Sequence, residues 1–375
     1  MKIVINTAHQ RFGGAVQVAL SFIHECRAFP EHEYFVWVGP GVKNSLKLEE
    51  FPDNFNFQFF DFGPITFRKT FRIHRMLKQA ENAINPDVII ATSGPTYFRT
   101  SIPQIIGYNL GLYLYTDSPF FQNRSLKDRI RFFIKRKLHF HFFKHEANAY
   151  VVQTDDVKKR VRQALKTDQV YTVTNTPSAW YRMEILSFPD KLPPKRSDVF
   201  RWLTVSSYYG HKNLELIPKV QDELEILGID NVEFILTLEE GDFHQHIGQQ
   251  RGIINVGPVP PVECPSLYRE CDGMFLPTLA ECFSASYPEA MIMEKPIVTT
   301  DLGFAHSICG RAALYYSPQN AAEAAKAILK LIQNEGLQKE LIEKGKDQLR
   351  IFDTPKERAR KYLKICEKYA KPREG

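Results

Sequence analysis

The sequence predicts an α/β protein made of two doubly wound domains with parallel sheets. Short apolar runs that suit buried strands alternate with stretches of helical periodicity, as expected for strands joined by crossover helices. The length of 375 residues suggests two or three domains. Three prolines between residues 188 and 198 interrupt regular structure and mark a linker. We therefore expect a first domain at 1–188 and a second at 198–350.

The elements of the first domain follow from its apolar runs and their spacing. Strands are expected at 2–6, 34–38, 57–60, 87–91, 104–108, 149–154 and 169–173. Helices are expected after the Gly13-Gly14 pair, at about 71–83, across 119–148 with a candidate break near Leu138, and from 155 to about 165. This alternation is typical of a sheet that helices cover on both faces.

The second domain shows the same alternation. Its strands are expected at 200–206, 232–236, 253–255, 273–276, 296–300 and 314–316. Helices are expected at 213–227, 265–269, around Pro288, at 320–334 and at 337–350. A last basic helix at 354–371 begins at Thr354-Pro355, which suits a helix start.

The stretch MFLPTLAECFSASYPEA, residues 274–290, carries the strongest functional signal. A buried strand is followed by a turn, a loop and a helix, and Glu281 and Glu289 stand eight positions apart across that junction. Ser284 and Ala285 are small, and Pro288 suits a first helical turn. Such a junction points backbone N–H groups into the crevice where parallel sheets bind phosphorylated ligands. The alternative interpretation is a helix start with two dipole-favoured glutamates and no ligand.

This stretch resembles the donor-site signature of glycosyltransferase family 4, a retaining group with the GT-B fold. The resemblance extends to NVGPVP and LYRECDGMFLP before it and to EKPIVTTDLG and ALYYSP after it. It covers nearly the whole second domain and, more loosely, the first. It implies two Rossmann-like domains facing a central cleft, with the final helix, 354–371, packing back on the first domain.

The resemblance assigns roles to the residues around the two glutamates. Glu289 is expected to bind the ribose hydroxyls of a nucleotide sugar. Glu281, with the N–H groups of Phe283, Ser284 and Ala285, is expected to hold the sugar hydroxyls and a phosphate. A carboxylate is a natural acceptor for hydroxyl donors.

Charge for the diphosphate is expected from the segment YYGHKN. Lys212 matches a family lysine that clamps the diphosphate, whereas the position of the partner arginine falls on Ser207. His211 stands beside Lys212 and is a candidate for part of the missing charge. The need is physical, because a leaving diphosphate develops charge that must be stabilised.

Three further sites follow from the same resemblance. Gly13 and Gly14 are expected to face the donor phosphates, because glycines let backbone approach a phosphate closely. The turn at Pro258-Val259 is expected to offer backbone groups to the nucleotide base. Asn109 occupies the position where many members carry a histidine near the donor sugar. We therefore take Glu281, Lys212 and Asn109 as the catalytic candidates.

The activity that the resemblance implies is hexosyl transfer from a nucleotide-diphosphate sugar to a glycan or lipid-linked acceptor, in surface polysaccharide biosynthesis. Retention without a protein nucleophile is expected, with the leaving phosphate taking the acceptor proton. No Asp-x-Asp motif occurs, so neither a metal nor a cofactor is expected. Two alternatives stay open: a GT-B sugar-nucleotide epimerase, and a non-catalytic relative that binds a nucleotide sugar.

Residues 124–145 form a basic stretch interleaved with aromatic and aliphatic residues. One interpretation is adsorption to an anionic membrane surface. The other is a helix with one face in the core of the first domain and the other in solvent. Nucleic acid is not an expected partner, because no RNA- or DNA-reading motif accompanies the charge.

The expected location of the protein in the cell follows from its N-terminal sequence, its apolar runs and its cysteines. MKIVINT reads as a strand rather than a signal peptide, and no apolar run is long enough to span a bilayer. The six cysteines are scattered, which favours reduced thiols. We therefore expect a cytoplasmic protein, peripheral at the inner face of the membrane if the basic stretch binds lipid.

Overall fold

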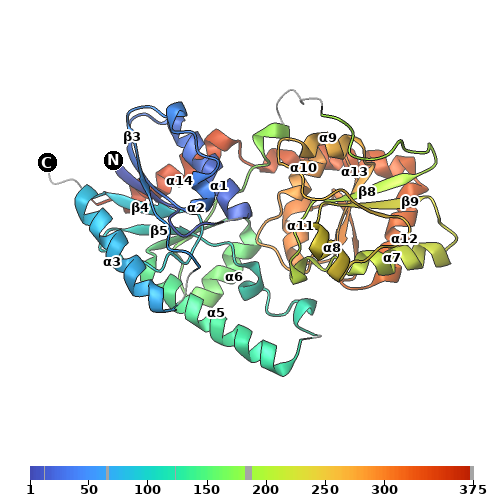
Figure 1. Cartoon of the computed structure of the whole chain (residues 1–375), viewed down its shortest axis with the longest axis horizontal. Coiled ribbons are helices and arrows are strands. Elements are labelled where there is room, and N and C mark those ends of the chain that lie inside the picture. Colours follow the sequence, from blue (N-terminus) through green and yellow to red (C-terminus); the bar gives the residue numbers. More distant parts are fainter. Residues whose placement is uncertain (12, 65–66, 123, 182–187, 372–375) are drawn as a thin grey trace. The chain divides into compact units, whose positions relative to one another are not determined.

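The computed structural model describes residues 1–11, 13–64, 67–122, 124–181 and 188–371 (Figure 1). Contacts divide the chain into two compact units. The first unit comprises Met1–Leu114, Ser125–Asn175 and Asp353–Gly375, and the second comprises Tyr115–Arg124 and Thr176–Phe352. The first domain was expected to run to residue 188. In the structure, residues 176–181 and the insert 115–124 belong to the second unit.

The first unit is built on a parallel sheet of seven described strands in the order β3-β2-β1-β4-β5-β6-β7. The strands are β1 (Lys2–Asn6), β2 (Glu33–Val38), β3 (Phe55–Phe59), β4 (Val88–Ala91), β5 (Gln104–Gly107), β6 (Ala149–Val152) and β7 (Val170–Thr172). Its helices are α1 (Gly14–Glu25), α2 (Pro40–Lys43), α3 (Phe67–Ile84), α4 (Gly111–Leu114), α5 (Leu126–Glu146), α6 (Asp155–Leu165) and α14 (Pro355–Tyr369).

Both faces of this sheet are covered, as the continuous apolar strands predict. Ile3 and Ile5 of β1 belong to one buried cluster, which includes residues of α1 and α14. Val4, between them, belongs to a second cluster with Ile73 and Leu77 of α3. Successive side chains of a strand point to opposite faces, so the central strand supports two cores.

The C-terminal helix α14 lies against α1 within the first unit (Figure 1). Arg358 of α14 is 2% exposed and forms two hydrogen bonds to Glu25 of α1, at 2.7 Å and 3.2 Å. Its Nη2 also donates to Ser21 Oγ at 2.7 Å. The rings of Tyr362 and Phe22 pack beside this pair, 5.1 Å apart. The last helix is therefore an integral part of the first unit.

The second unit has a parallel sheet of six described strands in the order β10-β9-β8-β11-β12-β13. The strands are β8 (Phe200–Thr204), β9 (Val232–Leu236), β10 (Ile253–Asn255), β11 (Gly273–Leu276), β12 (Ile297–Thr300) and β13 (Ala313–Tyr316). Its helices are α7 (Leu216–Ile226), α8 (Glu240–His246), α9 (Cys264–Arg269), α10 (Ser286–Ile292), α11 (Gly303–Cys309), α12 (Ala321–Ile332) and α13 (Glu335–Gln348). The predicted fold class, two α/β domains with parallel sheets, is confirmed.

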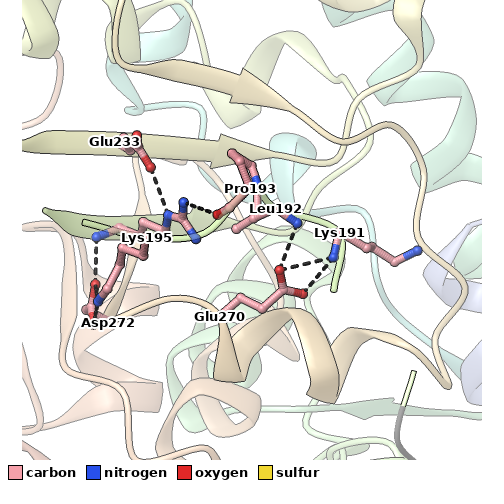
Figure 2. A network of polar contacts seen from close by, with 8 residues as sticks. Lys191, Leu192, Pro193, Lys195, Glu233, Glu270 and Asp272 are labelled. Carbon is pink, nitrogen blue, oxygen red and sulfur yellow. Dashed lines mark hydrogen bonds and ion pairs between the residues drawn. The ribbon is translucent and has the colours of Figure 1, made fainter. Parts of the chain in front are cut away.

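The linker is held to the amino-terminal edge of the second sheet by a polar network (Figure 2). Arg201 of β8, which is 3% exposed, donates to Glu233 Oε2 and to the Pro193 carbonyl, both at 2.8 Å. Asp272 accepts from Lys195 Nζ at 2.6 Å and from the Arg201 N–H at 2.8 Å. These contacts lie at the beginnings of strands β8 and β11, so the carboxyl edge of the sheet is left for other contacts.

Two local expectations need correction. The long helix expected across 119–148 is α5, which begins at Leu126 and continues through Leu138 without a break. Residues Pro119–Phe121 form a separate 3-10 turn, because Ser118 caps it by accepting from the Phe120 N–H.

Among the described helices, none combines the length and apolar composition that crossing a bilayer requires.

Candidate functional site

The loop between β11 and α10 lies at the carboxyl edge of the second sheet. Hydroxyl groups at the ends of neighbouring strands hold it in place: Thr299 Oγ1 donates to the Leu276 carbonyl and Thr300 Oγ1 to the Thr278 carbonyl, each at 2.8 Å. Thr204 of β8 likewise donates to the Phe275 carbonyl at 2.5 Å. The loop therefore starts from a position fixed by the two strands that flank β11, which suits a binding site.

Lys212 and Glu281 are brought together in this loop region. Lys212 Nζ forms an ion pair with Glu281 Oε1, and Thr278 Oγ1 donates to the same oxygen at 3.0 Å. The two charged side chains are 15% and 12% exposed. A mostly buried ion pair persists only where its remaining hydrogen-bonding capacity is met, by protein or by a ligand. Lys212 and Glu281 thus place a cation and an anion side by side at the carboxyl edge of the second sheet.

The turn that carries Lys212 is docked on the β11 loop through its neighbour His211. The His211 carbonyl accepts from the Leu279 N–H at 2.8 Å and from Thr278 Oγ1 at 3.3 Å. Burial lowers the pKa of the His211 imidazole, while the charge of Glu281 opposes that shift and the charge of Lys212 adds to it. At neutral pH the ring is uncharged, so it offers hydrogen bonds rather than a second positive charge.

The backbone before α10 carries N–H groups without a described acceptor. Among the described residues, none accepts a hydrogen bond from the N–H groups of Phe283, Ser284 or Ala285. Ser284 is 6% exposed, and the Phe283 ring packs edge-on against Phe352, with centroids 6.0 Å apart. Three successive N–H groups are thus available to a ligand beside Glu281.

Glu289, in the first turns of α10, has partners that the sequence did not predict. The Tyr181 hydroxyl and the Ser178 backbone lie beside its carboxyl. Burial raises the pKa of Glu289 from 4.5 to about 7, and these two neighbours act against that shift. Tyr181 is itself buried, with its ring edge-on to Tyr268 at 5.8 Å. The group expected to bind ribose is therefore close to half-protonated at neutral pH.

Two other expected donor contacts lie on loops of the same unit. Ser207, just after β8, is exposed, and its carbonyl accepts from Ser206 Oγ at 2.7 Å. Pro258 and Val259 follow Gly257, whose φ of 75° lies in the left-handed region that favours glycine. Pro258 is exposed and Val259 half-buried. Their role toward a base stays a prediction.

Arg124 is a second cation beside the turn that carries Lys212, and sequence reasoning missed it. It ends the insert 115–124, which is tied to the β11 loop because Ser118 Oγ donates to the Leu279 carbonyl at 2.8 Å. A methyl group on Gly210, in the turn before Lys212, would lie 3.0 Å from Arg124 Nη2. The Arg124 guanidinium also stacks on the Phe120 ring at 4.4 Å. The sequence grouped Arg124 with the basic helix, and no local signal separates them.

In the first unit, polar side chains gather where β1, β4 and β5 end. Asn109 Nδ2 donates to Ser93 Oγ at 2.9 Å, and Ser93 Oγ donates to Asn109 Oδ1 at 3.1 Å. His9, which follows β1, lies beside the Ser93 backbone, and burial lowers its pKa to about 4. His9 was missed, although its place after the first strand is a signal that reasoning from the sequence could have used.

The glycine pair of the first unit begins helix α1. Gly13 is the N-cap and has a φ of 81°, which only glycine adopts readily. A methyl group added to Gly14 would meet no atom within 4 Å, so the space beside it is open. Gly13, Gly14 and Asn109 thus belong to one unit, while Lys212, Glu281 and Glu289 belong to the other. The joint role of the two sets stays a prediction.

Among the described residues, no group of three or more His, Cys, Asp or Glu side chains is arranged to hold a metal ion. The six cysteines are buried and unpaired with one another.

Comparison with known proteins adds a family match and a set of similar structures. Residues 208–334 match the family model described as "Glycosyl transferases group 1", which spans the Lys212 turn, the β11 loop and α10. No curated protein matches the sequence significantly.

Solved structures resemble the chain over nearly its whole length. A sucrose-phosphate synthase from Thermosynechococcus elongatus aligns with a TM-score of 0.72 at 14% identity, covering 98% of both chains. A glycosyltransferase from Rickettsia africae gives 0.71 at 15% identity, again covering 98% of both. HepE from Anabaena, in complex with UDP and glucose, gives 0.65 at 16% identity, covering 97% of this chain and 99% of its own. The chain therefore has the GT-B fold, and its second unit contains the region similar to the group 1 glycosyl transferases.

Proposed function

We propose that this protein is a glycosyltransferase that moves a sugar from a nucleotide-diphosphate sugar to an acceptor. The observation that carries the proposal is the pairing of Lys212 with Glu281 at the carboxyl edge of the second sheet. Both residues lie inside the segment 208–334 that matches the group 1 glycosyl transferases. The pair offers one group for a phosphate and one for sugar hydroxyls at the same place.

Lys212 and Arg124 are the proposed cations for the diphosphate. When the bond between sugar and phosphate breaks, negative charge grows on the leaving diphosphate, and fixed cations stabilise it. A guanidinium can contact two phosphate oxygens at once, whereas an ammonium acts as a point charge. In this proposal Arg124 compensates for Ser207, where the family resemblance implies an arginine. The N–H groups of 283–285 add donors that need no reorganisation.

Glu281 and Glu289 are the proposed acceptors for hydroxyl groups. Glu281 is held by Lys212 and Thr278, so its second oxygen can accept from hydroxyls of the transferred sugar. Glu289 is proposed to accept from the ribose hydroxyls. Tyr181 is then proposed as a positioning residue, because its hydroxyl lies beside the Glu289 carboxyl and lowers the pKa of that group.

We further propose transfer with retention, in which the leaving phosphate takes the proton of the acceptor hydroxyl. The donor is proposed to be a hexosyl nucleotide; HepE, which has the same fold, has been solved with UDP and with UDP-glucose. His9 and Asn109 of the first unit are neutral groups suited to hydrogen-bond an acceptor or a sugar. A glycan or lipid-linked acceptor and a role in surface polysaccharide synthesis in the cytoplasm belong to the same proposal.

A binding screen followed by a turnover assay tests the proposal. The full chain is titrated calorimetrically with uridine, guanosine and adenosine diphosphate sugars, and the strongest binder is then incubated with and without candidate acceptor glycans. We expect one nucleotide class to bind and the sugar to be transferred. The epimerase alternative would show conversion of the sugar without an acceptor. The absence of binding to all three classes would contradict the proposal.

A further inference from the structure

Helix α5 (Leu126–Glu146) uses only one face for the core of the first unit. Phe143, which is fully buried, packs on Tyr108 with ring centroids 4.8 Å apart. Arg136 Nε donates to the Tyr113 carbonyl at 2.7 Å. Glu146, near the last turn, accepts from the Thr96 N–H at 2.8 Å. These three residues lie seven and three positions apart, so they share the side of α5 that faces the core of the first unit.

The opposite face of α5 carries large apolar side chains in solvent. Their exposed fractions are 73% for Leu126, 52% for Ile130, 49% for Phe133, 62% for Ile134 and 39% for Leu138. The steps of four, three, one and four residues place them along one side of the helix. Single exposed apolar residues are ordinary, but a contiguous stripe marks a surface that contacts something apolar.

Basic residues lie beside and between these apolar side chains. Six exposed lysines and arginines lie on α5, and its one exposed acid is Asp128. The six are Lys127, Arg129, Arg131, Lys135, Lys137 and Lys144. None of them forms an ion pair with a described residue. Lys137 stacks on the Phe133 ring at 4.7 Å, so charge and apolar surface are interleaved.

We propose that α5 lies flat on a bilayer containing anionic lipids, with the stripe from Leu126 to Leu138 entering the headgroup–acyl boundary. Exposed apolar side chains interleaved with lysine and arginine suit a helix at a membrane surface: the apolar residues leave water, and the cations meet lipid phosphates. A purely apolar partner protein would leave the six unpaired cations without counterions. The proposal does not rest on the proposed transferase activity, because lipid binding needs no nucleotide.

Vesicle sedimentation tests this surface. The full chain is centrifuged with vesicles of phosphatidylcholine, or of phosphatidylcholine mixed with phosphatidylglycerol, at low and high NaCl. We expect sedimentation with the anionic vesicles only, weakening as salt rises, because salt screens surface charge. Sedimentation that is no greater with phosphatidylglycerol than without it would overturn the proposal.

Paired variants separate the apolar and the charged contributions. I130Q/I134Q keeps the charge and helix propensity and is expected to lower vesicle binding at least about tenfold. K127Q/K135Q is expected to lower it by more than about tenfold, since each basic side chain near an anionic surface contributes roughly a factor of five. Matched controls lie in the second unit: I226Q, at an isoleucine that is 78% exposed on α7, and K326Q/K330Q on α12. The controls should bind like the wild type.

The outcomes remain decisive if a variant is unstable. In that case F133W is used: its emission should shift to shorter wavelength with anionic vesicles, more than that of the wild type, whereas I226W should not shift. Equal vesicle binding by I130Q/I134Q and I226Q would overturn the proposal, even if the wild type sediments. If the wild type is a dimer without lipid and I130Q/I134Q is a monomer, a second copy of the chain covers this face and the proposal is overturned.

Discussion

Replacing Lys212 by methionine removes the positive charge of the proposed site and keeps the apolar stem of the side chain. In the free protein this breaks the ion pair with Glu281, in which the two side chains are 15% and 12% exposed. Glu281 keeps the hydrogen bond from Thr278 Oγ1 at 3.0 Å. The carboxylate is therefore not left without partners, and the free energy of unfolding should fall by only about 1–2 kcal/mol.

The effect on nucleotide-sugar binding should be larger. A hydrogen bond to a charged group contributes roughly 1.5–3 kcal/mol. Losing the Lys212 contact with the diphosphate is therefore expected to raise the dissociation constant between about tenfold and a hundredfold. Activity should fall at least as much, because the charge on the diphosphate is greatest in the transition state.

Calorimetric titration and urea unfolding measure the two effects, and E281Q completes a double-mutant cycle. For stability, the coupling energy between the two positions is expected to be about 1 kcal/mol. The matched control is K195M, which removes an ion pair with Asp272, Nζ to Oδ1 2.6 Å, at the other edge of the same sheet. K195M should leave the affinity unchanged. Unchanged affinity in K212M, or an equal loss in K195M, would refute the assignment.

Three further predictions concern buried charges. Burial raises the pKa of Glu289 to about 7, so its carboxylate form, which accepts hydrogen bonds from hydroxyls, becomes more populated as the pH rises through about 7. The affinity for a nucleotide sugar, whose phosphates do not ionise near about pH 6, should therefore rise over that range. Calorimetry should find no such rise in E289Q. Burial also raises the pKa of Glu146 to about 7, so the folded state binds a proton more tightly than the unfolded state does. The free energy of unfolding in urea should therefore fall as the pH rises from about 4.5 to 7. E146Q should weaken this fall, and a pH profile identical to that of the wild type would contradict the prediction. R201M should lower the free energy of unfolding by about 2–3 kcal/mol, since it leaves Glu233 without its cation, while nucleotide affinity stays at the wild-type value.

The central strands could be read from the sequence because burial on both faces leaves a continuous apolar run. β1 (Lys2–Asn6) and β11 (Gly273–Leu276) begin and end where such runs do. β3 (Phe55–Phe59) was expected at 57–60, because an edge strand exposes one face and its run is less distinct. The short helices α2, α8 and α11 were not predicted, since one or two turns carry too little periodicity.

Reasoning from the sequence named Glu281 and Lys212 as candidates but could not predict that they pair. Glu281 and Lys212 were found from motifs that lie far apart in the sequence, and only the fold brings them into an ion pair. Arg124 was hidden because its neighbour in space is Gly210, which no local pattern links to it. Tyr181 was hidden for the same reason, because it lies beside Glu289 only in the fold and is far from it in the sequence.

The most direct test of the proposed donor site is a crystal structure of the full chain with a bound nucleotide sugar. We expect the diphosphate within hydrogen-bonding distance of Lys212 Nζ, the sugar hydroxyls at Glu281 and the ribose hydroxyls at Glu289. A nucleotide bound elsewhere, with Lys212 and Glu281 still paired only to each other, would contradict the proposed donor site.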